Sequence, residues 1–145
     1  MAVGELLPEG GPLQMATVRI FIVDDYEPWR RAVCSILEEC KDLEVICEGS
    51  DGLEAVQKSA ELQPDLVLLD IGLPNLNGLQ AACQIRKVSP GSKILFLTMH
   101  DSPELRQEAL RIGALGFVLK SDAARKLLPA VRAVTRNQRF VQKGP

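Results

Sequence analysis

The sequence has little of what metal–thiolate sites, membrane spans and nucleic-acid-binding surfaces require. It contains a single histidine, and its four cysteines form no C-x-x-C pair, so a zinc site is not expected. Its apolar runs are too short to cross a bilayer, and the N-terminus lacks the basic start and apolar core of a secretory signal. The net charge of -2 favours neither nucleic acid nor an anionic membrane as a partner. We therefore expect a cytoplasmic protein with free thiols that contacts no membrane and binds no nucleic acid.

What the sequence does contain is a regular alternation of apolar strands and amphipathic helices. Strands with few polar residues are typical of a parallel sheet that helices cover on both faces. Pro129 is the one awkward residue, because it falls inside the last helix unless that helix begins near residue 126. The strands are expected at 17–23, 43–49, 65–70, 93–98 and 115–120, and the helices at 27–40, 52–62, 77–88, 103–112 and 122–136.

This pattern predicts the fold class and the domain boundaries. We expect an α/β fold, a doubly wound (βα)5 sheet of five parallel strands in a three-layer sandwich. The length suits one domain, which we place at residues 17–136. Residues 1–16 are read as a flexible N-terminal arm, and residues 137–145 as a C-terminal tail or the start of a linker.

Polar side chains stand where the predicted strands end. Asp24 and Asp25 follow the first strand, Asp70 ends the third, Thr98 the fourth and Lys120 the fifth. The carboxyl ends of parallel strands meet at one edge of a sheet, so these groups should lie together. Clustered carboxylates repel one another, and a hard cation such as Mg²⁺ resolves that repulsion. A lysine and a hydroxyl suit the oxygens of a phosphoryl group, and a carboxylate can serve as its nucleophile.

The segments "VDD", "LLDIGLP", "LT" and "LK", in this order over residues 17–136, resemble the receiver domain of two-component response regulators. The resemblance implies the flavodoxin-like, CheY-like fold, and "LTMH" is similar to the NarL/LuxR-type regulators. It also implies that Asp70 is the phosphoacceptor, with Thr98 and Lys120 as its catalytic companions. The implied metal is Mg²⁺, with Mn²⁺ as a substitute. Its implied ligands are Asp25, Asp70 and the backbone carbonyl of Gly72, with Asp24 acting indirectly, and the implied switch residues are Thr98 and Phe117.

The resemblance further implies a signalling protein rather than an enzyme with an external substrate. Its own chemistry would be metal-dependent self-phosphorylation and autodephosphorylation, with a histidine kinase or a phosphotransfer protein as phosphodonor. The face formed by helix 103–112, strand 115–120 and helix 122–136 would pass the signal on. We expect this face to form a homodimer or to dock on an effector, with transcription as the output. The ending "RNQRFVQKGP" resembles the passage from receiver to linker in NarL-type regulators.

Some residues depart from the family pattern. Ser121 follows Lys120 where many receivers have a proline in a cis bond, and the sequence leaves open whether this bond is cis or trans. Met99 is larger than the residue usual after the hydroxyl, and it could crowd the entry to the phosphate. Phe117 lacks a tyrosine hydroxyl, so an inward switch would depend on burial alone.

Two other functions stay open from the sequence. One is a receiver-like interaction module that is never phosphorylated, although such modules usually have a degraded acidic pocket. The other is an aspartyl-phosphate phosphatase of the haloacid dehalogenase type. That class uses D-x-D, whereas the second position here is Gly72, so the general acid is missing. Turnover of a phosphomonoester would favour the phosphatase, and failure to take up a phosphoryl group would favour the module.

Overall fold

The computed structural model describes residues 16–142, and within that range it forms a six-stranded parallel sheet. The strand order is β3-β2-β4-β5-β6-β7, and every neighbouring pair is parallel. The strands are β2 (Val18–Val23), β3 (Leu43–Gly49), β4 (Leu66–Leu69), β5 (Lys93–Thr98), β6 (Gly116–Leu119) and β7 (Phe140–Val141). The expected parallel, doubly wound sheet is thereby confirmed.

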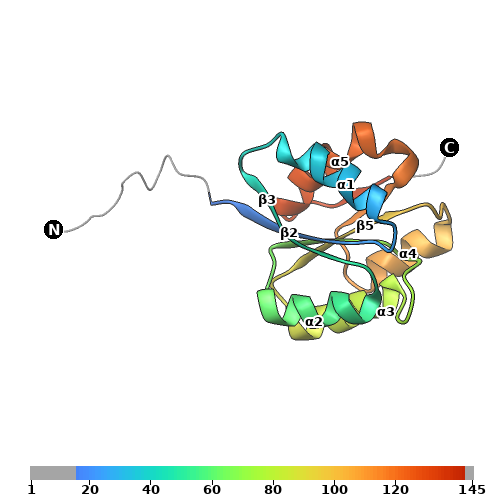
Figure 1. Ribbon diagram of the computed structural model, residues 1–145. Coiled ribbons are helices and arrows are strands. Elements are labelled where there is room, and N and C mark those ends of the chain that lie inside the picture. The colour runs from blue at the N-terminus through green and yellow to red at the C-terminus, as the bar shows by residue number, and fades with distance from the viewer. Residues whose placement is uncertain (1–15, 143–145) are drawn as a thin grey trace.

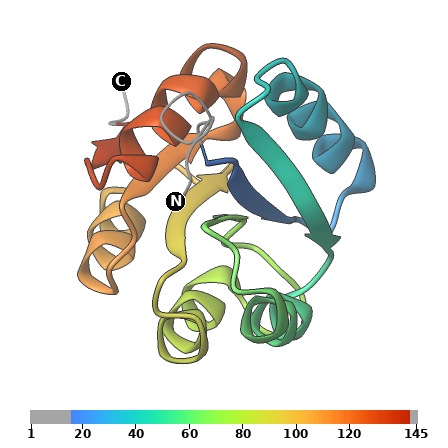
Figure 2. The same ribbon diagram turned by 90° about the vertical axis from the view of Figure 1, so that its left-hand side faces the viewer.

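Helices cover both faces of the sheet (Figures 1 and 2). They are α1 (Glu27–Glu38), α2 (Gly52–Leu62), α3 (Gly78–Val88), α4 (Pro103–Arg111) and α5 (Ala123–Thr135), with a 3₁₀ turn η2 (Lys120–Asp122) before α5. Figure 1 shows α1 and α5 on one side of the sheet and α2 and α3 on the other. Two apolar clusters form the core, one on each face of the sheet. Strands with two buried faces explain why β4 is apolar throughout.

Pro129 lies inside α5, which begins at Ala123 rather than near residue 126. A proline cannot donate a hydrogen bond to the carbonyl four residues earlier, here that of the exposed Arg125, and this usually breaks a helix. The helix is retained because its apolar stripe, which includes Leu127 and Val131, is fully buried against the sheet. Tertiary packing therefore outweighs the local preference.

The strand β7 was not expected from the sequence, which placed its residues in a tail. After α5 the chain turns at Asn137, whose backbone is left-handed with φ 62°, and the N–H of Gln138 donates to the carbonyl of Ala133 over 2.9 Å. The chain then runs back along β6, with Phe140 opposite Gly116 and Val141 opposite Phe117. Residues beyond the expected domain boundary at 136 thus extend the sheet.

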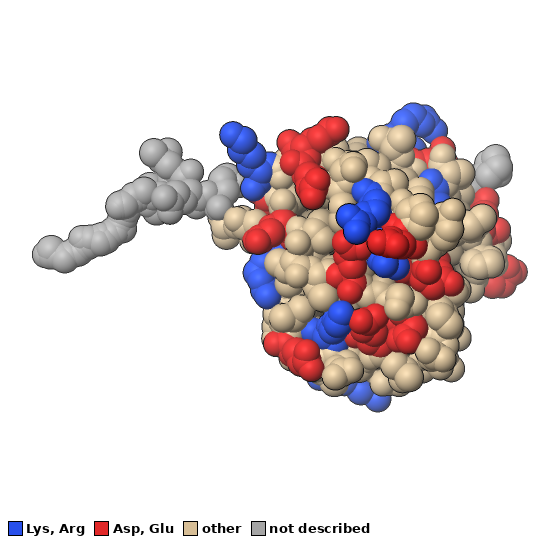
Figure 3. Space-filling model, in the orientation of Figure 1, with Lys and Arg blue, Asp and Glu red and all other residues tan. Residues whose placement is uncertain are grey.

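Charged groups of both signs are interspersed over the face drawn in Figure 3, in keeping with the small net charge. Within residues 16–142, the helices all fall short of the length and hydrophobicity that crossing a bilayer requires.

The loop after β4 is held by close backbone packing at Gly78. The N–H of Gly78 donates to the carbonyl of Ile71 over 2.7 Å. A Cβ at Gly78 would lie only 2.0 Å from the carbonyl oxygen of Asp70. Asn77 caps α3 in a capping box with Gln80, which fixes the other end of the loop. The glycine therefore sets the path of the chain that leaves Asp70.

We predict that Gly78→Ala destabilises the protein by about 3 kcal/mol, because the new methyl group cannot fit without moving the backbone of Asp70. Urea unfolding measures this change. Gly91→Ala is the matched control, because a Cβ there meets nothing within 4 Å, and it should stay within about 0.5 kcal/mol of the parent. Equal stabilities for the two variants would contradict the close packing.

Candidate functional site

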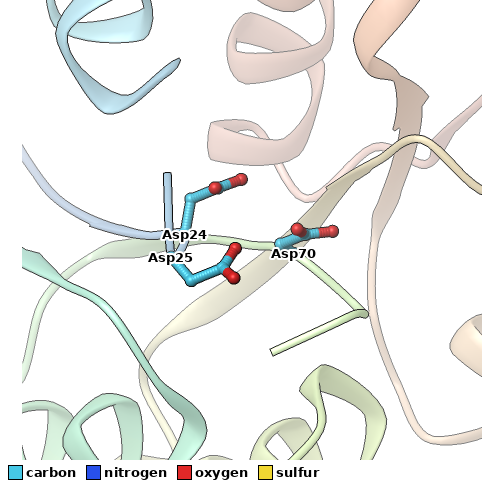
Figure 4. A group of neighbouring side chains, drawn as sticks. All are labelled: Asp24, Asp25 and Asp70. Carbon is cyan, nitrogen blue, oxygen red and sulfur yellow. The ribbon is translucent and has the colours of Figure 1, made fainter. Parts of the chain in front are cut away.

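Three carboxylates gather at the carboxyl edge of the sheet (Figure 4). Asp24 and Asp25 come directly after β2, and Asp70 comes directly after the neighbouring strand β4. Carboxylate oxygens of all three lie within 4.8 Å of one another. The N–H of Asp70 donates to the carbonyl of Val23 over 3.1 Å, which ties the two strand ends together. The sheet therefore brings these acids together as expected.

Asp24 is the most buried of the three, with 2% of its surface exposed. Its Oδ1 accepts a hydrogen bond from the N–H of Tyr26 over 2.9 Å. Its Oδ2 lies 2.5 Å from Nζ of Lys120 in an ion pair. Burial raises the pKa of Asp24 above its ordinary value, and the charge of Asp70 adds to the rise, although Lys120 and Tyr26 oppose it. A charged Asp24 is therefore costly and needs a nearby cation.

Asp70 is also nearly buried, with 8% of its surface exposed. Its Oδ2 accepts a hydrogen bond from Nζ of Lys120 over 3.2 Å, and its Oδ1 lies 3.4 Å from the N–H of Gly72. Asp25, in contrast, is exposed. Lys120 thus lies between two buried carboxylates, while the third carboxylate stands at the entrance.

A cavity of about 600 Å³ opens over this cluster. Besides the three acids, its lining includes Gly72, Met99, His100, Lys120 and Ser121. A Cβ at Gly72 would lie 3.5 Å from Nε2 of His100, so the imidazole lies next to that loop. Met99 is 78% exposed and lies at the rim, in the position from which it was expected to crowd the entry. The Lys120–Ser121 peptide bond is trans.

Thr98 and Phe117 lie beneath the site rather than in its lining. Thr98 is fully buried, and its Oγ1 accepts a hydrogen bond from the N–H of His100 over 3.2 Å. Phe117 is also fully buried and pairs with Phe96 on β5. Because side chains alternate along a strand, Thr98 and Phe96 project from the same face of the sheet, and Phe117 joins Phe96 in the cluster on that face.

Residues 20–132 match the family model for the response regulator receiver domain. The chain belongs to the response regulator receiver family.

Individual relatives of this receiver are regulators as well. The response regulator protein VraR of Staphylococcus aureus is 36% identical over 122 residues, covering 84% of this chain and 58% of VraR. The receiver thus spans a little over half the length of this relative. A LuxR-family two-component response regulator from Aurantimonas sp. SI85-9A1 superimposes with a TM-score of 0.82 at 32% identity, covering 86% of this chain and 89% of that one. The signal receiver domain of NarL from Mycobacterium tuberculosis gives a TM-score of 0.80 at 29% identity, covering 86% of this chain and 100% of that one.

These likenesses confirm the family and the fold expected from the sequence, including the similarity to NarL/LuxR-type regulators. Receivers of this family usually bind Mg²⁺ at an acidic pocket, and the Asp cluster stands where such a pocket is expected.

The donor set of this receiver fits a hard divalent cation. Three carboxylates and the one ammonium of Lys120 leave two negative charges in the cluster, which a divalent ion balances. Oδ2 of Asp24 is buried, and its 2.5 Å contact with Nζ of Lys120 is an ion pair without hydrogen-bond geometry. The ligand atoms of the three acids are carboxylate oxygens, the type that Mg²⁺ prefers.

Sequence reasoning missed two residues that organise the receiver's pocket. The indole of Trp29 lies 5.3 Å from Nζ of Lys120 in a cation–π contact. Arg30 donates to the carbonyl of Asp24 over 2.6 Å and pairs with Glu48 over 2.9 Å. Both lie in the first turn of α1, which begins two residues after Asp25.

We predict that Lys120→Met destabilises the metal-free receiver by about 2 kcal/mol at neutral pH, because it leaves two buried carboxylates without their cation. The pKa of Asp24 is higher in the folded protein than in the unfolded chain, so folding favours the protonated carboxyl. The stability that Asp24 contributes is therefore present at low pH and is lost as the pH rises through its folded pKa. The cost of the substitution should therefore shrink as the pH falls toward about 4.5.

Urea unfolding in the presence of a chelator, at both pH values, measures this effect. The exposed Lys41 supplies the control, since Lys41→Met should change stability little at either pH. A cost for Lys120→Met that does not depend on pH would mean that the ammonium does not serve the carboxylates.

Proposed function

We propose that this receiver accepts a phosphoryl group on Asp70 from a histidine kinase or a phosphotransfer protein in the cytoplasm, with Mg²⁺ or Mn²⁺ bound beside it. The observation that carries the proposal is the geometry at the strand ends. The carboxylate of Asp70 is 3.2 Å from the ammonium of Lys120 and shares a cluster with Asp24 and Asp25. The family places the phosphorelay role on this chain, and the residues assigned to it here are our proposal.

In the transfer, an oxygen of Asp70 attacks phosphorus, and a P–O bond forms. The bond from phosphorus to the imidazole nitrogen of the donor breaks, and the imidazole keeps the electron pair and takes up a proton. Hydrolysis reverses the modification when water attacks the same phosphorus atom and the carboxylate of Asp70 leaves.

The metal would be held by Asp25, Asp70 and the carbonyl of Gly72, with Asp24 acting indirectly. When bound, it supplies positive charge to the oxygens of the phosphoryl group. Lys120 would supply a second positive charge, and its contact with Asp70 already places the ammonium beside that carboxylate. Asp25 is exposed, so its carboxylate can meet an ion that arrives from solvent.

The response would begin at Thr98 and Phe117. Thr98 would turn its hydroxyl toward the phosphoryl group, and the layer beneath it would readjust. Phe117 is already fully buried here, so burial of its ring does not by itself distinguish the phosphorylated state. A shift in packing between Thr98 and Phe117, rather than entry of the ring, would bias the α4, β6 and α5 face toward its active form.

We predict that incubation with acetyl phosphate and a magnesium salt adds one phosphoryl group to the protein, as measured by intact mass. Asp70→Asn should abolish the gain, because an amide oxygen is a poor nucleophile, and a chelator should block it in the parent. A gain that persists in Asp70→Asn would place the acceptor elsewhere.

The chain's single tryptophan gives a control for metal binding alone. Because Trp29 lies near Lys120, adding Mg²⁺ should change its fluorescence saturably, and Asp25→Asn should remove the change without unfolding the protein. Metal binding without phosphorylation would favour the interaction module over the phosphoacceptor.

We also predict that the receiver is a weak homodimer through α4, β6 and α5, and that beryllium fluoride with Mg²⁺ strengthens it. Sedimentation velocity measures the change, with Asp70→Asn as the control that should not respond. The relatives are LuxR-type regulators, so we propose transcription as the output, through segments outside the residues described here. An unchanged sedimentation coefficient would refute the dimer while leaving phosphorylation standing.

A further inference from the structure

The backbone of the sixth strand is joined directly to β6. The N–H of Phe140 donates to the carbonyl of Leu115 over 2.9 Å, and the N–H of Gln142 donates to the carbonyl of Phe117 over 2.8 Å. These bonds place β7 along the outer edge of β6, the strand that ends at Leu119, directly before Lys120.

The side chain of Gln142 then reaches past the end of β6. Its Oε1 accepts a hydrogen bond from the N–H of Leu119 over 3.0 Å, and its Nε2 donates to Oδ2 of Asp122. Leu119 is the residue before Lys120, and Asp122 is two residues after it. One amide side chain therefore bridges both flanks of Lys120.

The hydrogen bonds from Gln142 matter for the backbone at Lys120. Here the chain changes from strand to the 3₁₀ turn η2, and a 3₁₀ turn has poorer hydrogen-bond geometry than an α-helix. Asp122 precedes α5 but makes no side-chain cap for it, and its carboxylate bonds Gln142 and Arg125 instead. A carboxylate at this position that does not cap the helix indicates that the bond to Gln142 is favoured over the cap.

We propose that Gln142 is a positioning residue for Lys120, and that through it β7 is energetically coupled to the phosphorylation pocket. The inference rests on the proposed function, since it gives Lys120 a phosphoryl group to meet. Holding Leu119 and Asp122 in place restricts the backbone from which the ammonium reaches Asp24 and Asp70. Coupling of this kind is reciprocal, so a ligand that engages Lys120 must also hold β7 more firmly.

If β7 has only a structural role, a different effect of losing the Gln142 side chain is expected. If β7 only covered the edge of β6, its backbone bonds would suffice, and loss of the Gln142 side chain would lower stability without changing the pocket. The two roles therefore separate in a binding measurement made on folded protein.

The first experiment measures the affinity for beryllium fluoride in the presence of Mg²⁺, followed by Trp29 fluorescence. We expect Gln142→Ala to bind about fivefold more weakly than the parent, because the ammonium is no longer held in place. Gln138→Ala is the matched control, because that glutamine is exposed in the turn before β7, and it should bind as the parent does. Far-ultraviolet circular dichroism confirms that each variant is folded.

A paired exchange of the two partners gives a rescue. Gln142→Glu should weaken binding, because two carboxylates then face each other, and adding Asp122→Asn should restore it by supplying an amide donor. Restored stability without restored affinity would overturn the positioning role.

The second experiment is amide hydrogen exchange at Phe140 and Gln142, whose N–H groups bond β6. In the parent, beryllium fluoride should slow exchange at both by about the same fivefold factor, and in Gln142→Ala it should not. If the parent binds beryllium fluoride but Gln142→Ala binds equally well, or exchange in β7 is unchanged, the inference fails and the proposed function stands. If the parent binds no beryllium fluoride, both fail.

Discussion

The ion pairs of one ammonium with two buried carboxylates are the interaction on which this receiver depends. Neighbouring parallel strands end side by side, so Asp24 and Asp70 are forced together in a place with little water. Lys120 lies 2.5 Å from one and 3.2 Å from the other, and it arrives from β6, two strands away from β4 in the sheet. The distance between these strand ends is bridged only because the lysine side chain is long and flexible. The position of Nζ of Lys120 therefore depends both on its contacts with the two carboxylates and on the order of the strands in the sheet.

The pocket has a fixed half and an adaptable half. Asp24, Asp70 and Thr98 are held by backbone hydrogen bonds and burial, whereas Asp25 and Met99 face solvent. The proposed site for an ion and a phosphoryl group requires acceptors that are held in place and an entrance that can rearrange. Burial supplies the first, since buried side chains sit in few rotamers, and exposure supplies the second.

The sequence predicted the strand ends well because strong local patterns determine them. Apolar runs that stop at Asp24, Asp70 and Thr98 indicate both the strand and the polar residue at its end. The order of these segments led to the correct family. The sixth strand escaped prediction because a two-residue strand has no periodicity of its own and exists only through its pairing with β6. Trp29 likewise reads as one more apolar residue of a helix until the fold places Lys120 beside it. What the sequence could not predict is therefore what long-range contacts decide.

The short length of β7 has a further consequence for how the protein behaves at high concentration. An open sheet has two free edges, and a long, flat edge can pair with a strand of another molecule. In the described part of the chain, β7 replaces β6 at one edge with a strand of only two residues. So short an edge offers few backbone groups to an incoming strand. The segment that bonds to the backbone around Lys120 therefore also reduces the tendency of the sheet to pair with a strand of another molecule.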